Sequence, residues 1–174
     1  MGSSPVADAD RGRDLMAEGA ARLVEGVERN GAAWVVEAVT RLVDLWARLA
    51  PGARAETLSA AREAGDAAAT RAATELRAFF ALDPADQRTT PLAIIRSLRR
   101  EATETLAAAG IPPIERDPYE VRSFPDDVYG IVPKSPADLG DDERAREELG
   151  GALLAWGMGK AAVLRARAAD TQPD

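Results

Sequence analysis

The strongest constraint on the fold is a long apolar stripe in the first third of the chain. Apolar or small residues recur there at steps of three and four over nine consecutive intervals, and charged residues fill many of the positions between them. The stripe consists of Met16, Ala20, Leu23, Val27, Gly31, Val35, Ala38, Leu42, Leu45 and Leu49. Because this spacing places its members on one face of an α-helix, it predicts a long amphipathic helix, which Pro51 and Gly52 end.

A second helix is predicted from about residue 53 to residue 82. Its inner stripe is built mainly from small residues: Leu58, Ala61, Gly65, Ala68, Ala72, Leu76 and Phe79. Since small residues let two backbones approach closely, we expect tight antiparallel packing against the first helix, helped by Gly19 and Gly26. The short Pro-Gly connection makes residues 13–82 an αα-hairpin.

Capping residues define a third helix and a proline-rich segment after it. Thr90 suits the N-cap, Pro91 the first helical position, and Gly110 the position after the last turn. Three further segments share one pattern: a capping side chain, a proline directly after it, and an acidic residue two positions after the proline. The capping residues are Asp83, Asp117 and Ser135. Each predicts a short helical turn, so residues 83–140 are expected to form a capped helix followed by an irregular cover over the bundle.

The last helix is predicted over residues 141–168. Residues 149–159 carry no charge and include four glycines, which is too short a stretch to span a bilayer and indicates a helix buried inside the bundle. The sequence therefore predicts an all-α fold with about four main helices in a single domain, residues 13–170. Residues 1–12 are expected to be disordered and residues 171–174 to form a loose tail.

Missing residue types exclude much chemistry. The chain has no cysteine and no histidine, which removes disulfides, thiolate nucleophiles, imidazole bases and the commonest transition-metal ligands. Gly157-Met158-Gly159-Lys160 lacks the first glycine and the hydroxyl residue of a P-loop, and no strand precedes it as a dinucleotide fingerprint requires. No cofactor and no metal are predicted, and an enzyme is disfavoured; a carboxylate acting with Tyr119 or Tyr129 is the remaining enzymatic reading.

Charge is unevenly distributed along the chain. The formal net charge is −7, yet residues 87–100 hold four arginines and no acid, whereas residues 101–148 hold thirteen acidic and five basic residues. The candidate anion- or partner-binding residues are Arg88, Arg96, Arg99 and Arg100. The candidate ion-pair or partner-surface residues are Asp126, Asp127 and Tyr129. Either the arginines pair internally with the acidic cover, which the opposite charges favour, or they bind an external anion.

Three segments of the second half resemble a group of small actinobacterial proteins of unknown function. They are Asp86-Gln87-Arg88-Thr89-Thr90-Pro91-Leu92, the stretch Phe124-Pro125-Asp126-Asp127-Val128-Tyr129, and Ala155-Trp156-Gly157 with Lys160. The resemblance covers residues 86–165 and departs at the charged run 141–148. It implies no activity, but it suggests that these residues form the functional half.

These observations favour a non-enzymatic helical protein that binds another protein or a second copy of itself, as a scaffold or regulator. The alternative is a nucleic-acid or phosphorylated-ligand binder that uses the arginine-rich third helix. An amphipathic protein that coats a lipid surface is disfavoured by the negative charge and by the few aromatic residues. No membrane association is predicted, and a cytoplasmic location is expected because no leader or membrane span is recognisable.

Overall fold

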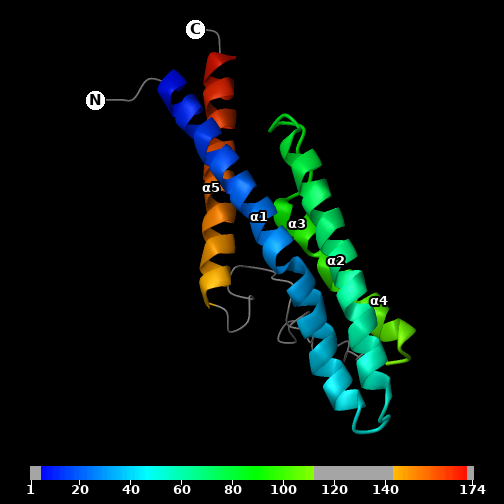
Figure 1. Ribbon diagram of the computed structural model, residues 1–174. Helices are drawn as coiled ribbons and strands as arrows, with labels where there is room; N and C mark the ends of the chain where they lie inside the picture. The colour runs from blue at the N-terminus through cyan, green and yellow to red at the C-terminus, as the bar shows by residue number, and fades with distance from the viewer. Residues whose placement is uncertain (1–4, 112–142, 172–174) are drawn as a thin grey trace, which may run out of the picture.

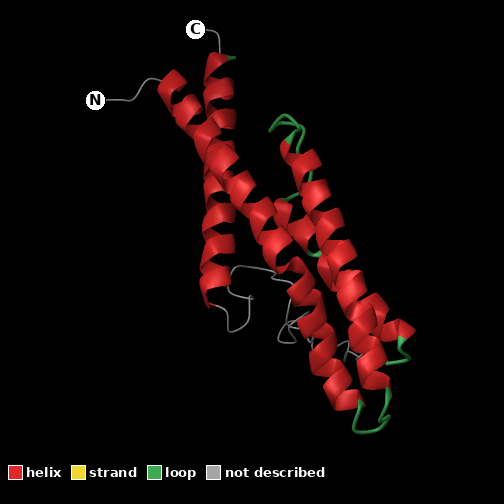
Figure 2. Cartoon of the chain, in the orientation of Figure 1, coloured by secondary structure: helices red, strands yellow, loops and turns green. Residues whose placement is uncertain are grey.

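The computed structural model describes residues 5–111 and 143–171 of the chain, and all regular structure within them is helical (Figure 2). The prediction of an all-α bundle is confirmed. The helices are α1 (Pro5–Trp46), α2 (Ala53–Phe80), α3 (Pro91–Ile95), α4 (Ser97–Ala108) and α5 (Glu143–Asp170). Within the described ranges, none of these helices has the length and hydropathy needed to cross a membrane.

Helix α1 is the spine of the molecule, and its two halves have different neighbours. Figure 1 shows α5 running antiparallel beside the N-terminal half of α1, and α2 running antiparallel beside its C-terminal half. Helix α4 packs against both α1 and α2. The largest fully buried side chains come from all five helices. They are Leu23, Val27, Val35, Val39 and Val43 of α1, Leu76 of α2, Pro91 and Ile95 of α3, Leu98 and Leu106 of α4, and Val163 of α5.

The stripe predicted for α1 is correct in its middle and wrong at its end. Leu23 and Val35 are fully buried, but Leu45 and Leu49 are 58% and 78% exposed. Val43 is buried instead. Of the elements that the structure describes, only α2, α3 and α4 lie near the part of α1 beyond the start of α5, and they cover one side of it. The helix also ends at Trp46, before Leu49 is reached.

The start of α1 also differs from expectation. Residues 5–12 belong to the helix, where the sequence predicted disorder over residues 1–12. Ala9 and Gly12 are buried, because the first turns of α1 lie against the last turns of α5. The helix continues through Gly31 without a break.

Glycines set how closely the helices approach, although not all as expected. A Cβ on Gly65 would lie 2.9 Å from the carbonyl oxygen of Ala32, which confirms close packing of α2 on α1. Gly19 instead faces α5, where an added Cβ would lie 2.5 Å from the backbone nitrogen of Trp156. A Cβ on Gly26 would have no described neighbour within 4 Å, so the prediction that this glycine helps α1 and α2 to pack closely is wrong.

The third helix has the predicted caps but is divided. The Thr90 hydroxyl accepts a hydrogen bond from the Ala93 backbone N–H at 3.2 Å, with Pro91 next to it at the helix start. Arg96 then separates α3 from α4, where a single helix was expected. Gly110, at φ 74°, ends α4 in a Schellman motif, in which the backbone N–H of Ile111 bonds the carbonyl of Leu106 at 3.0 Å.

The turn between α2 and α3 follows the predicted capping pattern. The Asp83 carboxylate accepts a hydrogen bond from the Ala85 backbone N–H at 2.9 Å, and the Asp86 N–H bonds the Asp83 carbonyl at 2.8 Å. The matching turns predicted at Asp117 and Ser135 lie outside the described residues.

Candidate functional site

Helix α5 has one buried and one exposed apolar face. Its inner face packs on α1 through Leu149, Ala152 and Trp156, which are at most 9% exposed. On the opposite side Leu154 and Met158, one turn apart, are 63% and 56% exposed. The prediction that this helix is buried inside the bundle is therefore wrong for its outer side. The physical reason is that, among the described elements, α1 is the main neighbour of α5 and covers one side of it.

The outer face is apolar over about three turns. No charged residue lies between Glu148 and Lys160 in the sequence. Around the two large side chains the exposed side carries small residues, Gly150 at one end and Ala161 at the other. Gly151 and Ala162 instead lie toward Arg22 and Gly12 of α1. We call Leu154 and Met158 with Gly150 and Ala161 the outer α5 surface.

The inner face of α5 is held in place by the Trp156 ring. This ring lies 5.8 Å from the Phe79 ring and 6.3 Å from the Phe80 ring, both at the end of α2. The Lys160 ammonium stands 5.2 Å from the centre of the indole and donates a hydrogen bond to the Gln87 carbonyl at 3.2 Å. The segments that begin at Asp86 and at Ala155, noted separately in the sequence, thus meet in space.

The far end of α5 is tied to the α2–α3 turn. Arg167 donates two hydrogen bonds to the Asp83 carboxylate, at 2.6 and 2.8 Å. The bond from Arg167, followed by the one from the Ala85 backbone, lowers the pKa of Asp83 to about 2. Since Lys160 and Arg167 both bind this region, α5 is fixed at two points, and among the described residues nothing covers Leu154 and Met158 on its outer side.

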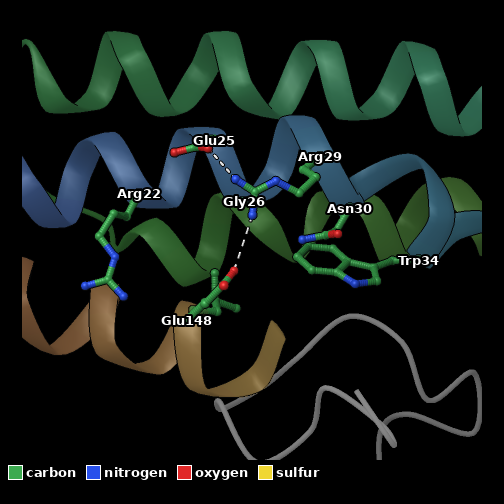
Figure 3. A pocket seen from close by; sticks show the side chains of 8 residues that line it. Arg22, Glu25, Gly26, Arg29, Asn30, Trp34 and Glu148 are labelled. Carbon is green, nitrogen blue, oxygen red and sulfur yellow. Dashed lines mark hydrogen bonds and ion pairs between the residues drawn. The ribbon is translucent and has the colours of Figure 1, made fainter. Parts of the chain in front are cut away.

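A small cavity of about 190 Å³ lies between α1 and the start of α5 (Figure 3). Arg29 crosses it and donates to Glu148 at 3.3 Å and to Glu25 on its own helix. The Trp34 indole forms part of its wall. The charged side chain that crosses this cavity is therefore already paired with two carboxylates. We read the cavity as part of the α1–α5 contact and not as a ligand site.

The four arginines predicted as binding residues do not behave as one group. Arg88, in the turn before α3, and Arg100, on α4, are exposed and make no ion pair with any part of the chain that the structure describes. Arg96 and Arg99 each interact with another group, and Arg99 is half-buried. The structure thus leaves two of the four available to an external anion.

The other predicted site residues, Asp126, Asp127 and Tyr129, lie outside the described residues. The outer α5 surface was not predicted. Residues 149–159 are apolar on both sides of the helix, so no polar residue marked the exposed side. Only the period of 3.6 residues separates Leu149 and Trp156 from Leu154 and Met158.

Across residues 5–111 and 143–171, no three acidic side chains lie close enough together to hold a metal ion. Comparison of the chain with protein-family models, with curated proteins and with solved structures gave no match.

Proposed function

We propose that this protein is a non-enzymatic helical interaction protein, and that the outer α5 surface is where it binds. The observation that supports this is the pair of exposed side chains Leu154 and Met158, in a stretch of α5 that has no charged residue between Glu148 and Lys160. A solvent-facing helix of a monomer normally carries charged or polar side chains there. Scattered exposed apolar residues are ordinary, but a contiguous apolar face on a firmly anchored helix is typical of a binding surface.

The energetics favour burial of this face. Full burial of a leucine or methionine side chain contributes roughly 1.5–3 kcal/mol each. No charged group has to be desolvated between Glu148 and Lys160, so little of that gain is offset. The surface covers only a few turns, and small interfaces of this kind form weak or transient complexes. A dissociation constant in the micromolar range or weaker is expected.

We infer that the partner is a second copy of this chain. The outer α5 surface has much the same pattern when it is read in either direction: the large residues Leu154 and Met158 lie at its centre, and the small residues Gly150 and Ala161 lie at its ends. An antiparallel pair of α5 helices about a two-fold axis would place Leu154 against the partner's Met158. The small residues at both ends would let the backbones approach. A two-fold axis is the commonest symmetry of protein oligomers.

Sedimentation velocity over a range of protein concentrations tests this proposal. The wild type is expected to shift toward a dimer as concentration rises, and the double variant Leu154→Ser, Met158→Ser is expected to remain a monomer at every concentration. The matched control is Leu45→Ser, Leu49→Ser, which removes two equally exposed leucines from the far end of α1 and should dimerise as the wild type does. A wild type that stays monomeric up to millimolar concentration, or a control that loses the dimer equally, would contradict the proposal.

A nucleic-acid or phosphorylated partner is the second candidate, favoured by the exposure of Arg88 and Arg100. Its support is narrower, because Arg96 and Arg99 already interact with other groups.

A further inference from the structure

A second hollow lies on the other side of α5, away from the outer α5 surface. Its volume is about 250 Å³, and it opens where α1, α5 and the α2–α3 turn meet. The walls are apolar and come from three parts of the chain: Met16 and Ala20 of α1, Phe80 and Pro84 at the end of α2 and its turn, and Trp156 and Val163 of α5. A dry cavity of about 150 Å³ accommodates benzene, so this hollow has room for a ring or a short alkyl chain with a polar head.

Two arginines stand at the edge of this hollow. Arg13 pairs with Asp10 at 2.5 Å on the surface of α1, and Arg167 pairs with Asp83. The first is an exposed pair three residues apart on one helix, which contributes little to stability, so its arginine is readily shared with another anion. Arg167 uses two of its five N–H donors on Asp83, which leaves the others for a second oxygen.

The Trp156 side chain forms part of the wall of the hollow and provides a probe of its occupancy. It lines the hollow and is 9% exposed, yet its indole N–H is buried without an acceptor in the part of the chain that the structure describes. Buried N–H groups without a partner are rare, since each costs about 1–3 kcal/mol. An occupant of the hollow would lie against this ring and change the surroundings of its indole N–H.

From these contacts we propose that the hollow binds a small carboxylate with an apolar tail, such as a medium-chain fatty acid or an arylalkanoate. The tail lies between Met16, Phe80 and Val163. The carboxylate faces the guanidinium groups of Arg13 and Arg167. The apolar walls favour the tail, and the two cations favour a carboxylate over a neutral or a positively charged head group.

Octanoate is a suitable probe, with octanol and octylamine as neutral and cationic analogues of the same chain length. The readout is the indole N–H resonances in a ¹⁵N correlation spectrum, where the chain's three tryptophans give separate signals that single Trp→Phe variants assign. Octanoate is expected to shift the Trp156 signal saturably and leave that of Trp46 unchanged. It is expected to bind at least about fivefold more tightly than octanol, which corresponds to about 1 kcal/mol for a charge-assisted contact. Octylamine is expected to bind most weakly.

Two variants test the location. Ala17→Phe fills the hollow from an exposed position on its edge and should weaken octanoate at least about tenfold, whereas Ala21→Phe, exposed one turn further along α1, should bind as the wild type does. Arg13→Gln should bring octanoate affinity toward that of octanol. The inference fails if octanoate leaves the Trp156 signal unmoved, if all three probes bind alike, or if both phenylalanine variants bind as the wild type does.

The same chemistry could come from a free acid or from an anionic lipid surface. Co-sedimentation with vesicles of phosphatidylglycerol separates these sources. The hollow has room for one short chain and not for a two-chain lipid, so we expect free octanoate to bind and the vesicles not to retain the protein. Free octanoate bound without retention on vesicles supports the proposal, and retention on vesicles that Ala17→Phe does not reduce would overturn it.

Discussion

Gly19 is a position at which the packing of α5 on α1 leaves no room for a side chain. A Cβ added there would lie 2.5 Å from the Trp156 backbone nitrogen and 2.6 Å from the Ala152 carbonyl oxygen. Ordinary contacts of a carbon atom are roughly 3.5 Å or longer, so the two helices would have to separate by about 1 Å. Both clashing atoms belong to the backbone of α5, so no side chain can turn aside to relieve them.

The size of the effect follows from two opposing terms. Alanine is favoured over glycine inside a helix by about 1 kcal/mol, which alone would stabilise α1. Overpacking costs about 1–3 kcal/mol, and here it also loosens the buried contacts of Trp156 and Ala152, which lie on the moved helix. We expect Gly19→Ala to lower the free energy of unfolding by about 1–2 kcal/mol net, or about 2–8 °C in Tm.

Urea unfolding followed by circular dichroism at 222 nm measures this effect, with Gly26→Ala as the matched control. Gly26 is on the same helix, two turns away, and nothing lies within 4 Å of the position its Cβ would take. The control is expected to be as stable as the wild type or more stable by up to about 1 kcal/mol. If Gly19→Ala is as stable as Gly26→Ala, the close approach of α1 and α5 is refuted.

Three further predictions concern caps and charges. Because the pKa of Asp83 is lowered in the folded protein, its pairing with Arg167 stabilises the fold above about pH 4, and this stabilisation is lost as the pH falls toward 2. The variant Asp83→Asn keeps the capping oxygen but loses the charge. Its Tm should be lower than that of the wild type at pH 7 and should match it near pH 2. Thr90→Ala should destabilise the protein by about 1 kcal/mol in chemical unfolding, whereas an unchanged midpoint would show that the cap contributes nothing. If Arg88 and Arg100 bind nucleic acid, fluorescence anisotropy with labelled single-stranded DNA should detect low-salt binding that their replacement by alanine reduces; equal binding by wild type and variant would exclude that role.

Periodicity and capping gave most of the fold, because both are local. Thr90 and Gly110 marked the ends of the third helical segment correctly, since a cap is a contact between residues close in the chain. The middle of the α1 stripe was also predictable. Its far end was not, because the burial of Val43 in place of Leu45 depends on which neighbours reach that part of α1.

The sequence could not predict which helix packs against each glycine of α1. Gly19 and Gly26 are seven residues apart and look equivalent along the helix, yet a Cβ on the first would meet the backbone of α5, and a Cβ on the second would meet no described atom within 4 Å. The uncharged run 149–159 was similarly ambiguous, since apolar residues on both sides of a helix are compatible with full burial and with an exposed binding surface. The number of neighbours decides between them, and that is a property of the folded chain.

The absence of cysteine allows the central claim, pairing through the outer α5 surface, to be tested directly. Chains carrying Leu154→Cys and Met158→Cys, each as a single substitution, are mixed at high concentration and oxidised, and the disulfide-linked peptides are quantified by mass spectrometry. Antiparallel pairing predicts that position 154 cross-links to position 158 of the partner more than to 154. Cross-linking no greater than that of an Ala21→Cys control on α1 would contradict it.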